Sequence, residues 1–291
     1  MPEAVFIPAE QPAPARPGGA ERPADSHPAA EHLVATDLAR GPWNLEAQHG
    51  GAPAALMMRA FERQPGGEQL ILARVTYELL RPVPLGPLEV RAEVVRHGRR
   101  VQLMEASLLT GDGTPVVRAR ALRVQRAAAP SVSAPPAPSA AGPPDRPEDG
   151  RPGEFPSGGV RMFSTDALEI RFTVGAFLEP GPAAAWFRLR HALVAGEEPS
   201  PLQRVACAAD FGNGISAVLP WDAYTFINPD LTIYLEREPV GEWIRLESET
   251  RLGRDGIGIS ESLIDDERGR VGRAIQALLV TERPPTSGGT L

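Results

Sequence analysis

The chain has 291 residues, of which 42% are hydrophobic and 23% are charged, the composition of an ordinary soluble globular protein of about two domains. No run of about 18 apolar residues is present, so we expect no membrane span. The formal net charge of −7 would repel a phosphate backbone, so we expect no nucleic-acid partner.

Cysteine and histidine usage also limits the chemistry. The single cysteine, Cys207, allows no internal disulfide and no cysteine-based zinc site, and the five histidines form no ligand pair. Residues 1–30 are acidic and proline-rich, without the basic start and apolar centre of a signal peptide. We therefore expect a reducing, cytoplasmic location, with no metal and no cofactor.

The 29 glycines and 32 prolines collect in a few segments, which predict the domain boundaries. These segments have little to bury, so they are expected to be extended or disordered. The predicted order is a disordered arm at 1–30, an N-terminal unit at 31–126, a Pro/Ala/Gly-rich linker at 127–159, a C-terminal unit at 160–283 and a tail at 284–291.

The N-terminal unit begins with a predicted helix. The segment GGAPAALMMRAFERQ starts at Gly50, has apolar residues at three- and four-residue spacings, and places Pro53 in the first turn. Residues 81–124 then alternate apolar and polar side chains in three runs, which predicts strands with one covered face. The turn sequence GDG at 111–113 makes these strands antiparallel hairpins.

The C-terminal unit repeats this order. Its helix, SPLQRVACAADFGNG, has Ser200 as the expected N-cap and Gly212–Gly214 as the expected end. Residues 237–280 then repeat the pattern of residues 81–124 at an offset of 156 without a gap, and this alignment pairs Gln276 with Arg120. Such a repeat predicts two copies of one supersecondary unit.

The two copies predict the fold class. Both helices are rich in small apolar residues, which is typical of a helix enclosed by other structure. The economical arrangement is one helix wrapped by a curved antiparallel sheet, made twice. We therefore predict an α+β fold with two helix-wrapped antiparallel sheets in one chain, a pseudo-dimer.

Four sequence blocks, in this order, resemble the double hotdog acyl-CoA thioesterases, in particular the acyl-CoA thioesterase II type. The resemblance implies a hotdog pair, hydrolysis of an acyl-CoA thioester, no metal and a site built around one water. The blocks are GPWNLEAQHGGAPAALMMRA (41–60), ACAADFGNG (206–214), FINPDLTIYLEREPVGEW (226–243) and GRVGRAIQALLV (269–280).

The resemblance also implies site residues. In that family an Asp near the end of the second helix, a Ser or Thr at the start of the following strand and a Gln on the last strand hold the attacking water. Asp210 and Gln276 match the first and third positions. Asn228 stands at the hydroxyl position, a departure from the family pattern, and Thr225 a few residues upstream is an alternative hydroxyl.

Residue chemistry supports the same group. Asp210 follows the apolar stripe of the second helix at its inner flank, where a carboxylate is costly unless it has partners or a function. We expect Asp210 to be the general base, with Asn228 and Gln276 positioning the water. Gly50 and Gly51 open the first helix with free N–H groups at its positive end, which predicts an oxyanion site. Each residue also has a structural alternative. These are a helix end for Asp210, a strand hydrogen bond for Gln276, an Asn–Pro turn for Asn228 and helix packing for Gly50 and Gly51.

Five further residues are candidates for substrate contact: His49, Trp43, Met57, Met58 and Phe226. Histidine at the start of a helix more often caps or packs, and the methionines and aromatic residues, Trp221 included, are as readily explained as core. Cys207 is expected to be a small core residue. Arg96, Arg99 and Arg100 either meet the CoA phosphates or form a solvated hairpin edge.

The leading prediction is a cytoplasmic thioester hydrolase of fatty acid metabolism that acts on acyl-CoA and forms a homo-oligomer, as hotdog proteins generally do. A non-catalytic hotdog that only binds an acyl thioester is the alternative that Asn228 favours. A hotdog dehydratase is less favoured, because it would need an Asp and a His together and the second half has only His191. Acyl length, head group and pathway stay open.

Overall fold

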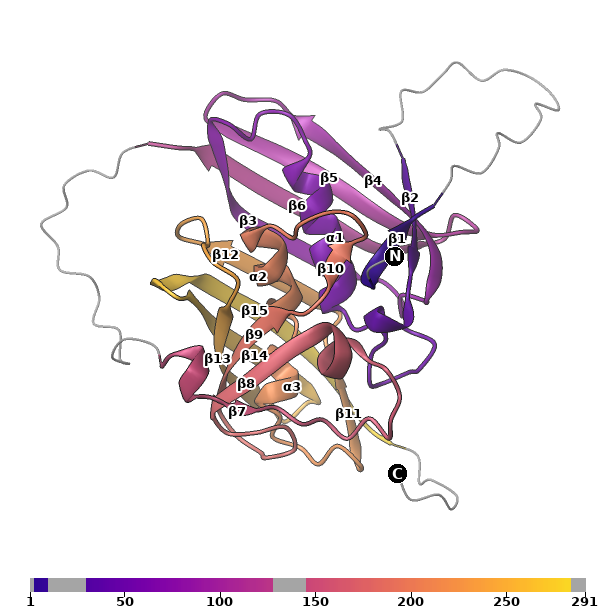
Figure 1. Ribbon diagram of the computed structural model, residues 1–291, viewed down its shortest axis with the longest axis vertical. Coiled ribbons are helices and arrows are strands. Elements are labelled where there is room, and N and C mark those ends of the chain that lie inside the picture. Colours follow the sequence, from indigo (N-terminus) through magenta and orange to yellow (C-terminus); the bar gives the residue numbers. More distant parts are fainter. Residues whose placement is uncertain (1–2, 10–29, 128–144, 284–291) are drawn as a thin grey trace, which may run out of the picture.

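The computed structural model describes residues 3–9, 30–127 and 145–283. The N-terminal half contains one long helix, α1, whose N-cap is Gly50, and six strands (Figure 1). Its elements are β1 (Ala4–Pro8), β2 (Glu31–Ala35), the 3-10 turn η1 (Asp37–Ala39), α1 (Gly51–Glu62), β3 (Leu70–Leu79), β4 (Gly86–Arg96), β5 (Val101–Thr110) and β6 (Pro115–Gln125).

The C-terminal half repeats the helix and the following meander, with extra strands before the helix. Its elements are η2 (Pro147–Asp149), β7 (Arg151–Pro152), the π-helical turn η3 (Phe163–Ala167), β8 (Leu168–Val174), β9 (Ala183–Leu189), β10 (Ala192–Val194), α2 (Pro201–Ala209), α3 (Gly212–Ile215), β11 (Tyr224–Ile227), β12 (Asp230–Leu235), β13 (Ile244–Leu252), β14 (Ile257–Asp266) and β15 (Gly269–Glu282).

The described strands form one hydrogen-bonded sheet rather than the two predicted. Their order is β10-β1-β2-β4-β5-β6-β3-β12-β15-β14-β13-β9-β8-β7, with β11 beside β15. The halves join where β3 pairs antiparallel with β12, so two predicted sheet edges satisfy each other's backbone groups. Helix α1 packs on β4, β5 and β6, and α2 packs on β13 and its neighbours, so each half does enclose its own helix.

A pseudo-twofold axis relates the halves and passes through the β3–β12 pair. Thr76 lies directly opposite Thr232, and their hydroxyl oxygens are 3.2 Å apart. These two residues are separated by 156 positions, so each is the other's repeat equivalent. The predicted offset therefore describes the strands nearest this axis.

The alignment without a gap is wrong in the last strand. Ser260, the equivalent of Met104, lies opposite Gln276, whereas Met104 lies opposite Ala121. Gln276 therefore corresponds to Ala121 and not to Arg120. Both hairpins carry a register irregularity, and a slip of one residue turns a side chain to the other face of a sheet. Gln276 is accordingly 1% exposed, whereas the Arg120 side chain is 73% exposed.

The end of the second helix also differs from the prediction. Helix α2 begins as expected, with the Ser200 hydroxyl accepting the Gln203 N–H at 3.1 Å. It ends at Ala209, with Asp210 as C-cap, before the glycine pair is reached. Neither Gly212 nor Gly214 adopts the positive φ of a terminating glycine, and the chain continues into α3.

Two predicted boundaries change as well. Residues 4–8, expected in the disordered arm, form β1 because Val5 and Phe6 are buried between β2 and β10. The predicted linker ends early, since residues 151–152 form β7 on the edge of β8. The other parts of the predicted arm and linker, 10–29 and 128–144, and the tail at 284–291 lie outside the described residues.

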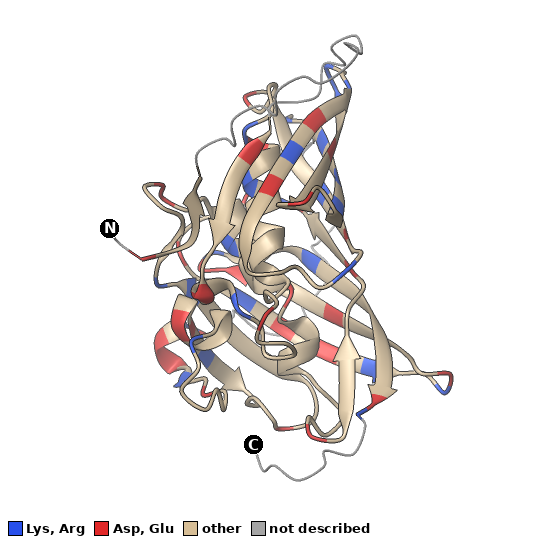
Figure 2. Ribbon diagram, turned by 90° about the vertical axis from the view of Figure 1, so that its right-hand side faces the viewer, with Lys and Arg blue, Asp and Glu red and all other residues tan. Residues whose placement is uncertain are grey.

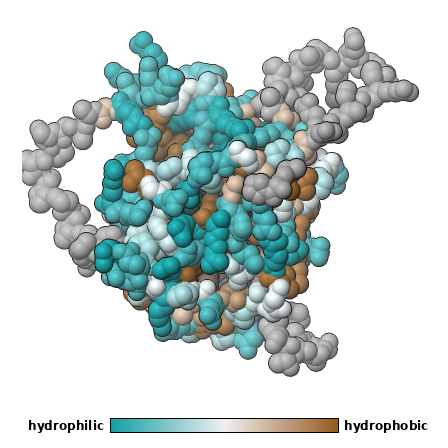
Figure 3. Space-filling model, in the orientation of Figure 1, coloured by the Kyte–Doolittle hydropathy of each residue, from teal (hydrophilic) through white to brown (hydrophobic). Residues whose placement is uncertain are grey.

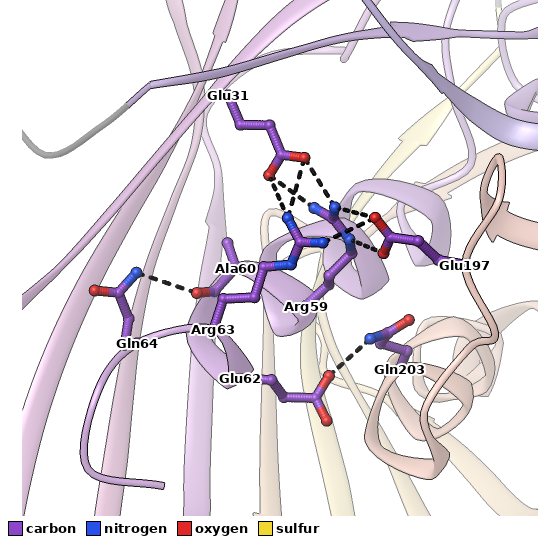
Figure 4. A network of polar contacts seen from close by, with 8 residues as sticks. All are labelled: Glu31, Arg59, Ala60, Glu62, Arg63, Gln64, Glu197 and Gln203. Carbon is purple, nitrogen blue, oxygen red and sulfur yellow. Dashed lines mark hydrogen bonds and ion pairs between the residues drawn. The ribbon is translucent and has the colours of Figure 1, made fainter.

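A polar network ties α1 to both halves (Figure 4). Arg59 is 2% exposed and donates to Glu31 at 2.8 Å and to Glu197 at 2.6 Å. Arg63 pairs with the same two carboxylates. Because Glu31 lies on β2 and Glu197 precedes α2, this cluster fixes the C-terminal end of α1 against the start of α2.

The surface is mixed in character. Figure 2 shows acidic and basic residues interspersed along the strands, and the face in Figure 3 is mainly hydrophilic with smaller hydrophobic areas. Within the described residues, no helix has the length and apolar character needed to cross a membrane.

Candidate active site

The Asp210 carboxylate lies where the end of α2 meets the start of α1. Asp210 is 6% exposed, and its Oδ2 is 3.1 Å from His49 Nδ1. A Cβ placed on Gly50 would lie 2.6 Å from Oδ2, so only glycine lets the carboxylate approach the helix this closely. The two halves thus meet at this carboxylate.

The other carboxylate oxygen is held by two amides. Asn228 Nδ2 donates to Asp210 Oδ1 at 2.8 Å, and Gln276 Nε2 lies 3.3 Å from the same oxygen. Gln276 is itself fixed, because its Oε1 accepts the Asn213 N–H at 3.3 Å. The orientation of the carboxylate is therefore set by β15, α3 and the residue that follows β11.

His49 has two competing contacts through one nitrogen. Its Nδ1 is 3.1 Å from the Gly51 N–H as well as from Asp210. One ring nitrogen cannot accept a hydrogen bond from the Gly51 N–H and donate a hydrogen bond to Asp210 at once. The ring is held in place by Phe211, which stacks on it with centroids 4.1 Å apart. The proton on Nδ1 therefore decides whether the Gly51 amide is engaged.

A cavity of about 410 Å³ opens onto this group. His49, Gly50, Asp210 and Asn228 line it, and most of its other lining is apolar. Trp43 and Trp221 form part of its wall and stack with ring centroids 4.6 Å apart. The cavity thus combines one carboxylate with a wall suited to an apolar chain.

The structure brings most of the predicted site residues together. Asn228 and Gln276 both donate to Asp210, and Gly50 lies against Asp210. Thr225 lines the cavity, but within the described residues its hydroxyl makes no hydrogen bond to Asp210. The amide of Asn228, and not that hydroxyl, occupies the position beside the carboxylate.

Other predicted contacts lie elsewhere. Met57 and Met58 are fully buried in the core and do not line the cavity. Phe226 packs edge-on against Trp43 behind the wall. Three predicted phosphate contacts, Arg96, Arg99 and Arg100, belong to the β4–β5 hairpin and not to the cavity.

Sequence reasoning missed several residues of the site. Phe211 and Asn213 stand within the block DFGNG, and their spacing after Asp210 was a usable signal. Ser164, which also lines the cavity, had no such signal because it lies in an irregular turn between the linker and β8.

Cys207 has no role as a nucleophile in this site. It is buried, and this burial raises the pKa of its thiol well above the usual range. In residues 3–9, 30–127 and 145–283, no group of three or more His, Cys, Asp or Glu side chains is placed to hold a metal.

Two family models match the sequence. The acyl-CoA thioesterase N-terminal domain matches residues 39–124, and the acyl-CoA thioesterase C-terminal domain matches residues 138–280. Each match contains the helix and the meander of one half. No curated protein matches the sequence.

Solved structures share the fold. A protein of unknown function with a hot dog fold from Alicyclobacillus acidocaldarius has a TM-score of 0.68 at 16% identity, over 90% of this chain and 95% of that one. A protein provisionally named thioesterase II, from Thermobifida fusca, has a TM-score of 0.64 at 18% identity, over 87% and 92%. One provisionally named thioesterase, from Novosphingobium aromaticivorans, has a TM-score of 0.63 at 19% identity, over 86% and 95%.

At these identities the structures establish the hotdog fold, and the two family models, one for each half, establish the family. The chain therefore belongs to the double hotdog acyl-CoA thioesterase family.

Proposed function

We propose that the chain hydrolyses acyl-CoA thioesters with a water that Asp210 activates. The observation that carries this proposal is the placement of Asp210: one carboxylate oxygen is fixed by two amides, while the other faces the start of α1 in a largely apolar cavity. Such a carboxylate is oriented for one task, and its low-dielectric surroundings strengthen its interaction with a water or a developing charge.

The reaction follows from this arrangement. Asp210 takes a proton from the water as the water oxygen forms a bond to the thioester carbonyl carbon. The carbonyl oxygen becomes an oxyanion beside the first amides of α1. The oxyanion then reforms the carbonyl as the carbon–sulfur bond breaks, and the proton passes to the departing thiolate. The products are a carboxylic acid and CoA.

The two amides take different parts. Both N–H bonds of Asn228 are used, one on Asp210 and one on the Asp230 carbonyl at 3.1 Å, so its own oxygen is left to accept a hydrogen bond from the water. Gln276 is engaged by protein at both ends. Gln276 therefore orients Asp210, and Asn228 orients the water.

The test is an assay of the purified protein with acyl-CoAs of increasing chain length. A thiol reagent reports released CoA, and the buried Cys207 thiol should not react with it. We expect CoA release from at least one acyl-CoA. No release from any chain length would contradict the proposal.

Two other functions have a specific observation in their favour. Asn228 in place of a hydroxyl favours a protein that binds an acyl thioester without cleaving it; tight binding without turnover would show this. The dehydratase is less favoured because the second half has no Asp and His together, but His49 of the first half lies 3.1 Å from Asp210, and this contact is the observation in its favour. Incubation with a 3-hydroxyacyl-CoA should give free CoA under our proposal and an enoyl-CoA under this alternative.

The broader setting stays a prediction. We propose, from the family alone, that the protein acts in fatty acid metabolism in the cytoplasm as a homo-oligomer. Light scattering of the purified protein would measure the assembly.

A further inference from the structure

Ser164 has a buried hydroxyl that the mechanism above does not use. The residue is 5% exposed, and it lines the same cavity as Gly50 and Asp210. Within the part of the chain that the structure describes, the Ser164 hydroxyl has no hydrogen-bond partner. A buried unpaired hydroxyl is unfavourable, which points to a partner that arrives with the ligand.

The turn that carries Ser164 is held firmly. It is the π-helical turn η3, a geometry found often at functional sites. Asp166 accepts the Met162 N–H at 2.9 Å and the Thr165 hydroxyl at 2.6 Å, and the Phe163 N–H donates to the Arg40 carbonyl at 2.9 Å. The unpaired hydroxyl is therefore not a consequence of a loose loop.

This turn also packs on the start of α1. A Cβ on Gly51 would lie 3.1 Å from Phe163 Cε1, and the Phe163 ring lies 5.5 Å from the His49 ring, centroid to centroid. The residue preceding Ser164 thus contacts the segment where the thioester carbonyl is expected. Ser164 comes from the C-terminal half and Gly51 from the N-terminal half.

The oxyanion site needs a second donor. The Gly51 N–H already points at His49 Nδ1, 3.1 Å away, whereas the Gly50 N–H has no acceptor among the described residues. One free amide alone is a weak oxyanion site, since known sites combine several donors. The unpaired hydroxyl of Ser164, a residue that lines the same cavity, can provide the missing one.

We propose that the Ser164 hydroxyl donates a hydrogen bond to the carbonyl oxygen of the bound thioester, together with the Gly50 N–H. The proposal rests on the proposed function, because the oxyanion forms only if the thioester is attacked. No covalent bond to Ser164 forms, and the hydroxyl keeps its proton throughout. The interaction strengthens as charge develops on the carbonyl oxygen, so it acts on kcat more than on KM.

The experiment compares two buried serines with opposite surroundings. Ser164→Ala removes an unpaired hydroxyl, whereas Ser248→Ala removes one that is bonded to the Ser262 hydroxyl at 2.7 Å, away from the cavity. For Ser164→Ala we expect kcat to fall about 100-fold with little change in KM and no decrease in Tm. For Ser248→Ala we expect a lower Tm with unchanged kcat. Ser164→Cys, with a weak S–H donor of similar shape, should have an intermediate kcat.

The results separate the two proposals. An active wild-type protein with an equally active Ser164→Ala variant would overturn the Ser164 assignment alone. A Ser164→Ala variant whose Tm falls, and whose activity falls only as far as the loss of folded protein explains, would give Ser164 a structural role and would also overturn it. A wild-type protein without hydrolase activity would remove the proposed function and the Ser164 donor with it.

Discussion

Two crevices related by the pseudo-twofold axis lie at opposite ends of the α1–α2 pair, and the carboxylate in each has different hydrogen-bond partners. In one, Asp210 at the end of α2 faces Gly50 at the start of α1. In the other, Glu62 at the end of α1 faces Ser200 at the start of α2, whose hydroxyl donates to it at 2.9 Å. Gln203 donates to the same Glu62 oxygen at 2.8 Å (Figure 4).

Part of the difference lies in a few side chains. Asn228 and Gln276 of the first crevice correspond to Leu72 and Ala121 of the second, so among the described residues no amide at these two positions orients Glu62. The α2 start is also closed, because Ser200 covers the Gln203 amide that it caps. The Asp210 carboxylate lies beside a helix start whose Gly50 N–H has no acceptor among the described residues, whereas Glu62 accepts a hydrogen bond from the hydroxyl that caps the start of α2.

The largest expected effect is on the carboxylates themselves. Asp210→Asn keeps the shape but removes the base, so we expect kcat for acyl-CoA hydrolysis to fall about 1000-fold. Glu62→Gln is the matched change in the second crevice and should leave kcat within about twofold. Steady-state assays with the best acyl-CoA substrate, with circular dichroism to confirm folding, measure both.

Either of two results would break this comparison. Wild-type turnover by Asp210→Asn would remove Asp210 as the base. A loss of turnover in Glu62→Gln without unfolding would show that the second crevice also takes part in the reaction.

The next effect concerns Gly50 at the start of α1. Gly50 has φ −58° and ψ −24°, a conformation that alanine adopts without strain, so Gly50→Ala tests space alone. The added Cβ would lie 2.6 Å from Asp210 Oδ2 and must displace the carboxylate. We expect kcat to fall about 100-fold, because a small misplacement of a catalytic group is costly. Unchanged turnover would mean that the close approach of Asp210 to α1 has no catalytic value.

The sequence predicts much of this comparison, for identifiable reasons. The repeat and the helix signals place Asp210 at one helix end and Gly50 at the other helix start, and the hotdog resemblance brings those ends together. The catalytic roles stay predictions. The correspondence of Gln276 with Ala121 was out of reach, because hairpin register depends on irregularities that the alternating pattern does not reveal.

Contacts across the halves were also unpredictable. His49 reaches Asp210, and Ser164 reaches the cavity, through packing between segments far apart in the chain. Neither has a periodic or motif signal that refers to the other half. The joining of β3 to β12 is likewise made by backbone groups, which every residue carries, so side-chain patterning does not reveal it.

A smaller effect is expected at the capped start of α2. Ser200→Ala removes the hydroxyl that accepts the Gln203 N–H and donates to Glu62. We expect a loss of about 1 kcal/mol in the free energy of unfolding, the usual cost of an N-cap, with no change in kcat. Urea unfolding measures the first and the CoA-release assay the second. A loss of turnover larger than the loss of folded protein would show that α2 contributes to catalysis from its start.

The smallest effect is a pH dependence of stability that separates the two carboxylates. Burial raises the pKa of Glu62, and the hydrogen bonds from Gln203 and Ser200 offset this only in part. Because the folded-state pKa lies above the unfolded one, the folded protein holds the proton more tightly, and this contribution is fully present below the ordinary glutamate pKa of about 4.3. It is lost as the pH rises from there through the folded-state pKa.

The Glu62→Gln side chain carries no charge at any pH, and the contributions of all other groups cancel in the difference from wild type. The free energy of unfolding of this variant relative to wild type should therefore increase over that interval. A difference that is constant, or that decreases with pH, would mean that the second crevice accommodates the Glu62 charge without cost. The contrast with the Asp210 crevice would then rest on Asn228, Gln276 and the free Gly50 N–H alone.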